Sequence, residues 1–475
     1  MLTELRSLFK RIALNSLWLL IARVFSQGLM IVFTVLVARY LGEVGLGQYA
    51  FIAAVVFLGN VLTTFGLDTL LIREVARTRS APSTTLPFDG DQDRRRGSGG
   101  VLSLSKGQGS GRRAAPLVTA TLWIQLGFSA LLIGGIAVGA GWLPNKTPET
   151  VLGLRLYSLS LIPLAFNTAF SASLRAYERM DLILVLNLLS AVVQTGGALG
   201  LLQTGRGLVA LVVFLLAVQT LTAVVAGGMC FRWLPGFVLT RRVPRRLVRR
   251  MLHQSYPLAL VAVLMVAYQR LGVLMLSSLA DDAATGWFAA AARITDALKM
   301  VHYAYFGAVF PLMSRLAVDS PLPGDSQDAR NIERGLYRTS FGLLLGFGLL
   351  TALAVTPLAQ PVIRLLYGLS YAPSVPALQI LVWTLIPFAV SSHVFFWLIS
   401  NGREKATLKV IALTLGSTAV LNVLLIPAFG LVGACLAALA GEVLQAVLYM
   451  PYAWRGISDF RFQLSDFEFT ERDGL

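Results

Sequence analysis

Long runs of apolar residues, separated by short polar segments, recur along the whole chain. A helix needs about 20 such residues to cross the hydrocarbon core of a bilayer. A scan with that length predicts twelve spans. Their approximate limits are 12–37, 47–72, 117–143, 150–174, 181–203, 207–230, 255–279, 284–313, 336–358, 377–400, 407–427 and 431–454. The pattern therefore predicts an all-α integral membrane protein with twelve transmembrane helices.

The composition supports a membrane protein and argues against several other classes. Of 475 residues, 56% are hydrophobic and 13% are charged, and the mean hydropathy is +0.70, which is too apolar for an ordinary soluble chain. A net charge of +16 would suggest nucleic acid in a soluble protein, but most basic residues lie in loops on one side of the predicted spans. We therefore expect no nucleic-acid partner.

The sequence offers no enzyme site. The three histidines, His253, His302 and His393, share no metal-ligand spacing with each other or with Cys230 and Cys435. There is no glycine-rich phosphate loop and no nucleophile elbow. We expect no cofactor and no metal, and the two cysteines fall near opposite membrane faces, too far apart to pair.

The distribution of basic residues predicts the orientation. The side that holds both termini carries 31 Lys and Arg residues, whereas the other side carries five. Basic residues are retained on the cytoplasmic side of a membrane. We expect a multi-pass protein of the cytoplasmic (inner) membrane with both termini in the cytoplasm.

An internal repeat relates the two halves. Four motifs recur: Leu161-Ile162-Pro163 as Leu385-Ile386-Pro387, Arg179 as Arg403, Gly207-Leu208-Val209 as Gly430-Leu431-Val432, and Gly47-Gln48-Tyr49-Ala50 as Gly286-Trp287-Phe288-Ala289. The offset is 239 for the last motif and 224 falling to 223 for the others. Two six-helix lobes in parallel repeat follow from this pattern.

The repeat divides the chain into four parts. We expect an N-terminal lobe at 1–230, a basic cytoplasmic linker at 231–254, a C-terminal lobe at 255–458 and a cytoplasmic tail at 459–475. Within the first lobe, residues 79–116 have too little apolar content to fold alone and are predicted to be a disordered cytoplasmic insertion. It is either a solvated tether or a regulatory segment. The linker's basic residues either anchor the topology or contact anionic lipid.

Short motifs give the chain a family resemblance. A glycine-rich turn at 41–50, the segments 65–68 and 72–77, and Leu366-Tyr367-Gly368 with Tyr371 occur in the order seen in polysaccharide flippases. The chain resembles the O-antigen (Wzx-type) members of the multidrug/oligosaccharidyl-lipid/polysaccharide exporter superfamily. The resemblance implies a MATE-like V-shaped transporter that moves polyprenyl-diphosphate-linked oligosaccharide by alternating access, with polymerases and glycosyltransferases as possible partners. The insertion at 79–116 departs from the family pattern.

Four basic residues inside predicted spans are candidates for substrate binding: Arg23, Arg270, Arg293 and Lys299. Charges at such depth are costly and normally face a bundle interior or wet cavity. Guanidinium groups present paired donors to phosphate, so a diphosphate or acidic sugar is the expected ligand. Alternatively, Asp296 pairs with Arg293 and Lys299 and the cluster only holds helices together.

Four further residues are candidates for coupling to a proton or sodium gradient: Asp68, Asp296, Glu442 and His302. A buried carboxylate can take up a proton or cation near neutral pH. The alternatives are structural, with Asp68 capping a helix or pairing with Arg73, and His302 packing in the bundle. The membrane potential is a further possible energy source.

The sequence leaves more than one function open. A lipid-linked oligosaccharide flippase with a cationic central cavity is the first hypothesis. A multidrug/cation antiporter of the same fold is the alternative, but such a cavity should be lined with carboxylates, and basic residues outnumber them here. A polymerase or ligase would need large external loops, and only 359–376 is of any length.

Overall fold

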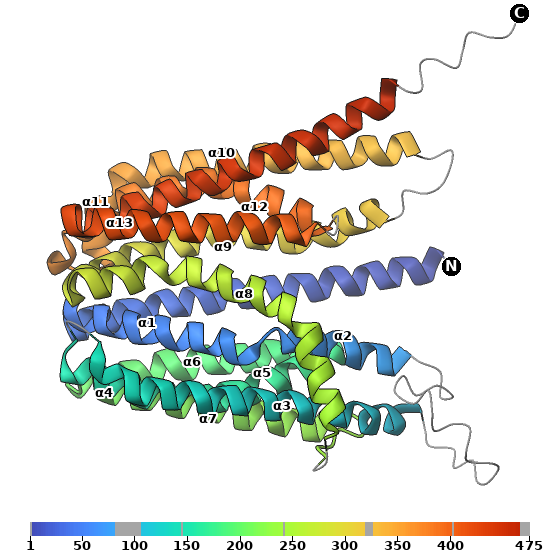
Figure 1. Ribbon diagram of the computed structural model, residues 1–475, viewed down its shortest axis with the longest axis horizontal. Helices are drawn as coiled ribbons and strands as arrows, with labels where there is room; N and C mark the ends of the chain where they lie inside the picture. Colours follow the sequence, from blue (N-terminus) through green and yellow to red (C-terminus); the bar gives the residue numbers. More distant parts are fainter. Residues whose placement is uncertain are drawn as a thin grey trace, which may run out of the picture. The chain divides into compact units, whose positions relative to one another are not determined.

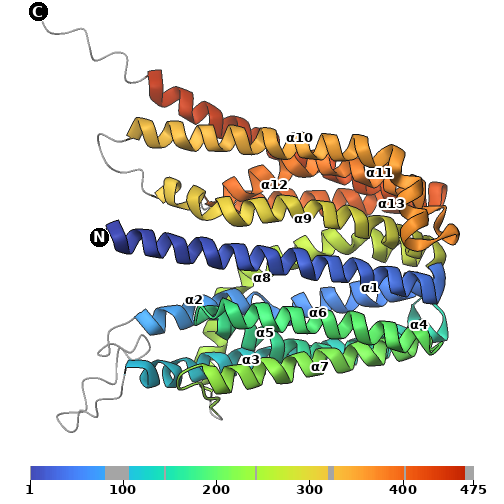
Figure 2. The same ribbon diagram turned by 180° about the vertical axis from the view of Figure 1, so that it is seen from behind.

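Helices make up nearly all of the described residues in the computed structural model (Figure 1; Figure 2 shows it from behind). The backbone is described for residues 2–80, 106–143, 146–240, 243–318, 326–400 and 403–465, and the side chains for 25–75, 114–143, 146–240, 243–306, 339–399, 403 and 405–452. No strand occurs in these ranges. The all-α prediction is confirmed.

The chain divides into two compact units. The first comprises residues 1–41 and 48–266, and the second comprises 42–47 and 267–475. Six residues of the first helix thus belong with the second unit. The basic segment 231–254 belongs with the first unit, and so do the residues that follow it up to 266. The lobe and linker limits expected from the sequence stay a prediction.

The first unit contains the helices that match the first six predicted spans. They are α1 (Leu2–Thr64), α2 (Leu67–Ser80), α3 (Lys106–Gly139), α4 (Pro148–Ser158), α5 (Leu161–Ala176), α6 (Met180–Gln203) and α7 (Leu208–Trp233), followed by the first part of α8 (Arg245–Leu279). α5 packs against α2, α3 and α7, and α7 also packs against α4 and α6. α5 is therefore the helix around which this unit is built.

The second unit holds the remaining part of α8 and the helices α9 (Asp282–Val318), α10 (Ser326–Tyr367), α11 (Ser374–Leu381), α12 (Leu385–Ser400) and α13 (Glu404–Ser465). α12 packs against α9, α10 and α13, and α11 packs against α9, α10 and α13. α12 thus occupies in this unit the central place that α5 has in the other.

Two of the long helices each contain two predicted spans. α1 has a non-helical residue at Gly42 (φ 70°) and α13 has one at Gly430 (φ 54°). Positive φ is readily adopted only by glycine, so the chain reverses its path at these points. Spans 12–37 and 47–72 therefore meet at the first kink, although the second of them ends earlier than predicted, at Thr64. Spans 407–427 and 431–454 meet at the second kink.

The predicted repeat is visible in the local structure. The Leu-Ile-Pro motifs begin α5 at Leu161 and α12 at Leu385, two helices of 16 residues, each after a short break in its span. The backbone N–H of Arg179 donates to the Leu174 carbonyl at 3.0 Å, and that of Arg403 donates to Leu398 at 2.9 Å. Each pair is related by the same offset of 224, so both units close this turn in the same way.

Nine segments of the described chain are long and apolar enough to cross a membrane. Two of them, Phe25–Thr64 and Lys405–Tyr452, each contain a kink and two predicted spans. The predicted span at 284–313 is not among the nine, because Arg293, Asp296 and Lys299 fall in every 18-residue stretch of the well-described part of α9. Three of the charges singled out in the sequence thus lie on one predicted span and keep it out of this set.

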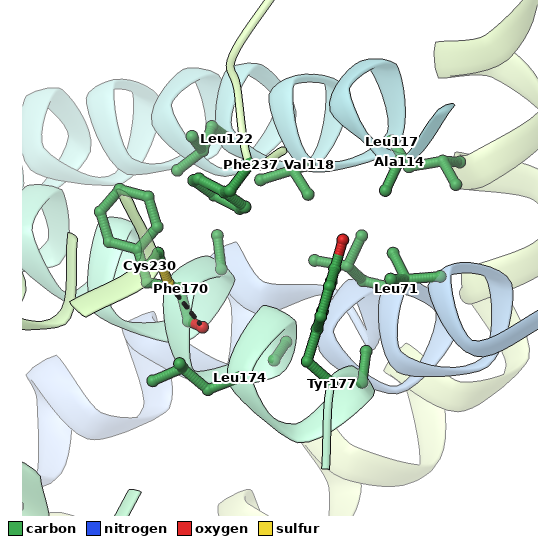
Figure 3. Close-up of a cluster of buried hydrophobic side chains, with 14 of the residues drawn as sticks. Leu71, Ala114, Leu117, Val118, Leu122, Phe170, Leu174, Tyr177, Cys230 and Phe237 are labelled. Carbon is green, nitrogen blue, oxygen red and sulfur yellow. Dashed lines mark hydrogen bonds between the residues drawn. The ribbon is translucent and has the colours of Figure 1, made fainter. Parts of the chain in front are cut away.

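The first unit has a large hydrophobic core at the end where α2, α3, α5 and α7 meet (Figure 3). Phe237, in the segment after α7, points into it beside Phe170 and Leu122. The Phe237 ring lies 5.2 Å from that of Phe231 and 6.3 Å from that of Phe170. The basic segment expected to be a linker is therefore attached to this core.

Two predicted segments lie partly outside the described residues. Of the insertion predicted at 79–116, α2 reaches Ser80 and α3 begins at Lys106, and 81–105 are not described. Of the tail predicted at 459–475, the backbone of α13 continues to Ser465 and 466–475 are not described.

Candidate functional site

A buried ion pair joins two helices of the second unit. The Lys299 ammonium, on α9, donates to Oε1 of Glu442, on the second arm of α13, at 2.7 Å. The two side chains are 17% and 8% exposed. A charge-assisted hydrogen bond at this distance is strong, and burial of both partners makes its loss costly. The pair brings together a candidate for substrate binding and a candidate for ion coupling.

Aromatic side chains surround this pair. The Lys299 ammonium lies 4.7 Å from the centre of the Phe388 ring, in cation–π geometry. Tyr268 of α8 and Tyr303 of α9 are close enough to Glu442 to interact with it electrostatically. The ammonium is therefore held from two sides, by a carboxylate and by a ring face.

Close packing positions both partners. A Cβ added at Gly441 would lie 2.4 Å from Thr418 Oγ1 and 3.3 Å from the Tyr268 hydroxyl. Glycine at position 441, next to Glu442 in the sequence, thus lets the two arms of α13, before and after the kink at Gly430, approach each other closely. On α9, Leu298 packs against the core formed by α10, α12 and the short helix η3 (Val382–Thr384), which fixes the turn that carries Lys299.

The two arginines of this unit are partly buried. Arg270 lies on α8 and Arg293 on α9. Arg293 interacts electrostatically with Tyr367, whose hydroxyl donates to the Ala290 carbonyl at 3.3 Å. Both guanidinium groups contain buried nitrogens with no hydrogen bond in the described side chains, Nε of Arg270 and Nε and Nη2 of Arg293.

The other predicted residues are more dispersed. Asp296 is exposed on α9, and the carboxylate beside Lys299 is that of Glu442. His302 is buried, with its ring 5.4 Å from Phe388 and 5.8 Å from Phe347. Arg23 is on α1, but its side chain lies outside the described ones.

Asp68 lies in the first unit and has a structural role available. It is in the first turn of α2, where a carboxylate is favoured by the helix dipole. Arg73, its possible partner from the sequence, has Nε 3.8 Å from Oε1 of Glu74.

Phe388 was not identified from the sequence, although a signal was present. It directly follows the repeated Leu385-Ile386-Pro387 motif, which places it in the first turn of α12. Helix–helix contacts across 89 residues of sequence cannot be read from spacing along one helix. Among the described residues, no group of His, Cys, Asp or Glu side chains could hold a metal ion.

Comparison with solved structures identifies the fold. The chain is similar to an inward-facing multidrug resistance MATE family transporter of the MOP superfamily, with 14% identity, a TM-score of 0.70, and 92% of this chain and 95% of that chain covered. It is similar to the lipid II flippase MurJ in an inward closed conformation, with 14% identity, a TM-score of 0.68, and 91% and 86% covered.

A third structure has the same fold. It is a MOP superfamily transporter from Pyrococcus furiosus, described as having a binding pocket of reverse polarity that suggests a different function, with 13% identity, a TM-score of 0.62, and 94% and 96% covered. At these low identities, the TM-scores establish a common fold. Among curated proteins, no relative matches the sequence.

A family model matches most of the chain. The model for polysaccharide biosynthesis proteins covers residues 12–93 and 97–317, which is well over half of the 475 residues. It includes the first unit's helices apart from the first ten residues of α1, and most of α9, with Lys299. The chain therefore belongs to the polysaccharide biosynthesis protein family and has the fold of the MOP superfamily transporters.

Proposed function

We propose that this protein is a flippase that moves polyprenyl-diphosphate-linked oligosaccharide across the cytoplasmic membrane by alternating access. Its family acts in polysaccharide biosynthesis, and its fold is that of transporters, one of which is a lipid II flippase. The proposal involves no catalytic step. Glycosyltransferases and a polymerase that make and extend the oligosaccharide are the expected partners, and a proton gradient, a sodium gradient or the membrane potential is the expected energy source.

One observation carries the choice of an anionic substrate. Basic side chains lie on α8 and α9 of the second unit, with Arg270, Arg293 and Lys299 all partly buried. Among the side chains that the structure describes, Glu442 is the one buried carboxylate beside Lys299, whereas Asp296 is exposed. Retaining several cations in this environment is costly unless they face a polar ligand or cavity. A diphosphate fits these groups because guanidinium and ammonium bind phosphate oxygens strongly.

The multidrug/cation antiporter remains the alternative. The MATE-family neighbours favour it by fold, and the described binding pocket of reverse polarity indicates that one fold can carry pockets of either sign. A site for organic cations needs unpaired carboxylates or aromatic faces. The sign of the intramembrane charges therefore favours the flippase.

The test replaces the candidate arginines one at a time. Arg23→Gln and Arg270→Gln should abolish complementation of a flippase-deficient strain while leaving membrane abundance nearly unchanged, because the charge and not the side-chain volume is lost. Lys at either position should retain partial activity, since it keeps the charge without the planar fork. The measurement is the amount of lipid-linked oligosaccharide that accumulates per unit of inserted protein.

The matched control is Arg206→Gln, which removes one positive charge from an exposed loop residue. It should support full complementation. If the double variant Arg23→Gln/Arg270→Gln also complements fully, the cationic-site mechanism is wrong. If export of ethidium depends on the chain and oligosaccharide transport does not, the antiporter is the correct function.

A further inference from the structure

We propose that Glu442 is an exchangeable counter-ion for Lys299: it holds the ammonium before the substrate binds and releases it to the substrate's diphosphate. The inference rests on the proposed function and adds a residue-level account of how the site accepts its anionic ligand. In this account Lys299 contributes to affinity and Glu442 opposes it. The pair thus prevents a free cation from attracting other anions, such as lipid headgroups.

The internal repeat gives this ion pair no counterpart in the first unit. At the offset of 239 that relates α1 to α9, Lys299 corresponds to Asn60, and at the offset of 223 that relates α7 to α13, Glu442 corresponds to Gln219. The first unit therefore has neutral amides where the second has opposite charges. If the pair served only to hold equivalent helices together, the first unit would need it as well.

The hydrogen bonding of Glu442 is incomplete. Oε1 accepts from Lys299, whereas Oε2 is buried and accepts no hydrogen bond from any described side chain. Losing Lys299 would leave the buried carboxylate uncompensated, which is costly, so the exchange needs other donors that can take the place of the ammonium. The hydroxyls of Tyr268 and Tyr303, which interact electrostatically with Glu442, are suitable donors.

The environment of Lys299 suits an exchange of anions. The ammonium keeps its contact with the Phe388 ring, 4.7 Å from the ring centre, whichever anion binds it. A lysine side chain is a flexible stem with a compact charge, so it can follow a new partner over a short distance. Other ionisable groups near this pair are His302, which is buried, and Asp296, which is exposed and interacts electrostatically with Tyr303.

Binding of farnesyl diphosphate to the purified full-length protein tests the proposal, with farnesol as the uncharged control ligand. Glu442→Gln should tighten farnesyl diphosphate binding by about tenfold, the effect of removing a competitor comparable to one charged hydrogen bond. Lys299→Gln should weaken it to a similar extent. In the Lys299→Gln background, Glu442→Gln should have no further effect, because the two residues act as a unit. Farnesol binding should not change in any variant.

Matched variants separate this effect from others. Glu149→Gln removes one negative charge from the exposed first turn of α4 and should leave binding unchanged. Thermal unfolding, followed by tryptophan fluorescence, checks that each variant is folded. If Glu442→Gln does not fold, Glu442→Asp, which withdraws the carboxylate by one methylene, should give a smaller tightening.

The outcomes distinguish the inference from the function on which it rests. If the wild-type protein binds farnesyl diphosphate no better than farnesol, the proposed function is wrong. If the wild-type protein binds the diphosphate and a folded Glu442 variant binds it equally or more weakly, the ion pair is structural and only the present inference fails. Tightening that persists without Lys299 would also overturn the inference.

Discussion

Gly47 and Gly286 are equivalent in the internal repeat, and each lies directly against the backbone of the other's helix. A Cβ at Gly47 would be 1.7 Å from the Asp282 carbonyl oxygen, and one at Gly286 would be 1.9 Å from the Glu43 carbonyl oxygen. Glu43 and Asp282 are related by the same offset of 239 as the two glycines. The contact is therefore symmetric, and all four residues belong to the second compact unit.

We expect that alanine at either glycine disrupts this contact. A methyl group cannot fit so close to a backbone carbonyl, and backbone cannot move aside as a side chain can, so Gly47→Ala or Gly286→Ala should destabilise the protein by about 1–3 kcal/mol. The measurement is the thermal unfolding midpoint of the purified protein in detergent, together with its abundance in membranes.

Gly416→Ala is the control, because a Cβ at this position on α13 would have nothing within 4 Å. It should leave the midpoint unchanged or raise it slightly, since alanine favours helix. An unchanged midpoint in both Gly47→Ala and Gly286→Ala would show that the two backbones can separate at little cost.

The sequence predicted the helices well because crossing a membrane imposes a local requirement on composition. All twelve predicted spans correspond to helical segments, including the charged span on α9. The repeat could also be recognised in the sequence, because the short motifs that begin at Leu161 and Leu385 each start equivalent helices. Gly42 and Gly430, where α1 and α13 are kinked, both fall in the gaps between predicted spans.

The candidate site was predicted only as a set of residues. Lys299 and Glu442 were both recognised as intramembrane charges, but their partnership spans 143 positions and depends on how α9 and α13 pack. Reasoning from helical spacing pointed to Asp296, three residues from Lys299, as the partner. Spacing along one helix describes neighbours on its own surface, whereas a buried pair is selected by the helices that face each other.

The attachment of the basic segment to the first unit leads to a second prediction. Phe237 is 8% exposed, and the backbone N–H of Thr240 donates to the Thr119 hydroxyl at 3.0 Å. Phe237→Ala should remove a large apolar contact of this segment with the core, at a cost of about 3 kcal/mol. Local opening exposes backbone to proteases, so trypsin should cleave within the basic run at 241–250 faster than in the wild-type protein.

Val238→Ala provides the control for this experiment, because Val238 is the adjacent residue and is 42% exposed. Its cleavage rate should equal that of the wild-type protein. Equal rates for Phe237→Ala would mean that the segment is held by other contacts, such as the one between Thr240 and Thr119.

The last prediction concerns the orientation that we expect from the excess of basic residues on one predicted side. Arg206 lies in the exposed turn between α6 and α7, and Arg246 is exposed in the first turn of α8. The turn before α7 and the segment after it lie at opposite ends of a helix that is expected to cross the membrane. They should therefore face opposite sides of it. We therefore expect a cysteine at Arg206 to react with an impermeant maleimide in intact cells, and a cysteine at Arg246 to react only after the cells are made permeable.

The two native cysteines should not interfere, because Cys230 and Cys435 are both fully buried. Each substitution also removes only one of many basic residues, so the orientation itself should not change. Labelling at Arg246 but not at Arg206 in intact cells would reverse the orientation. The basic run at 241–250 would then lie outside the cell, and the proposed direction of transport, from the cytoplasmic side where the linked sugars are made, would be wrong.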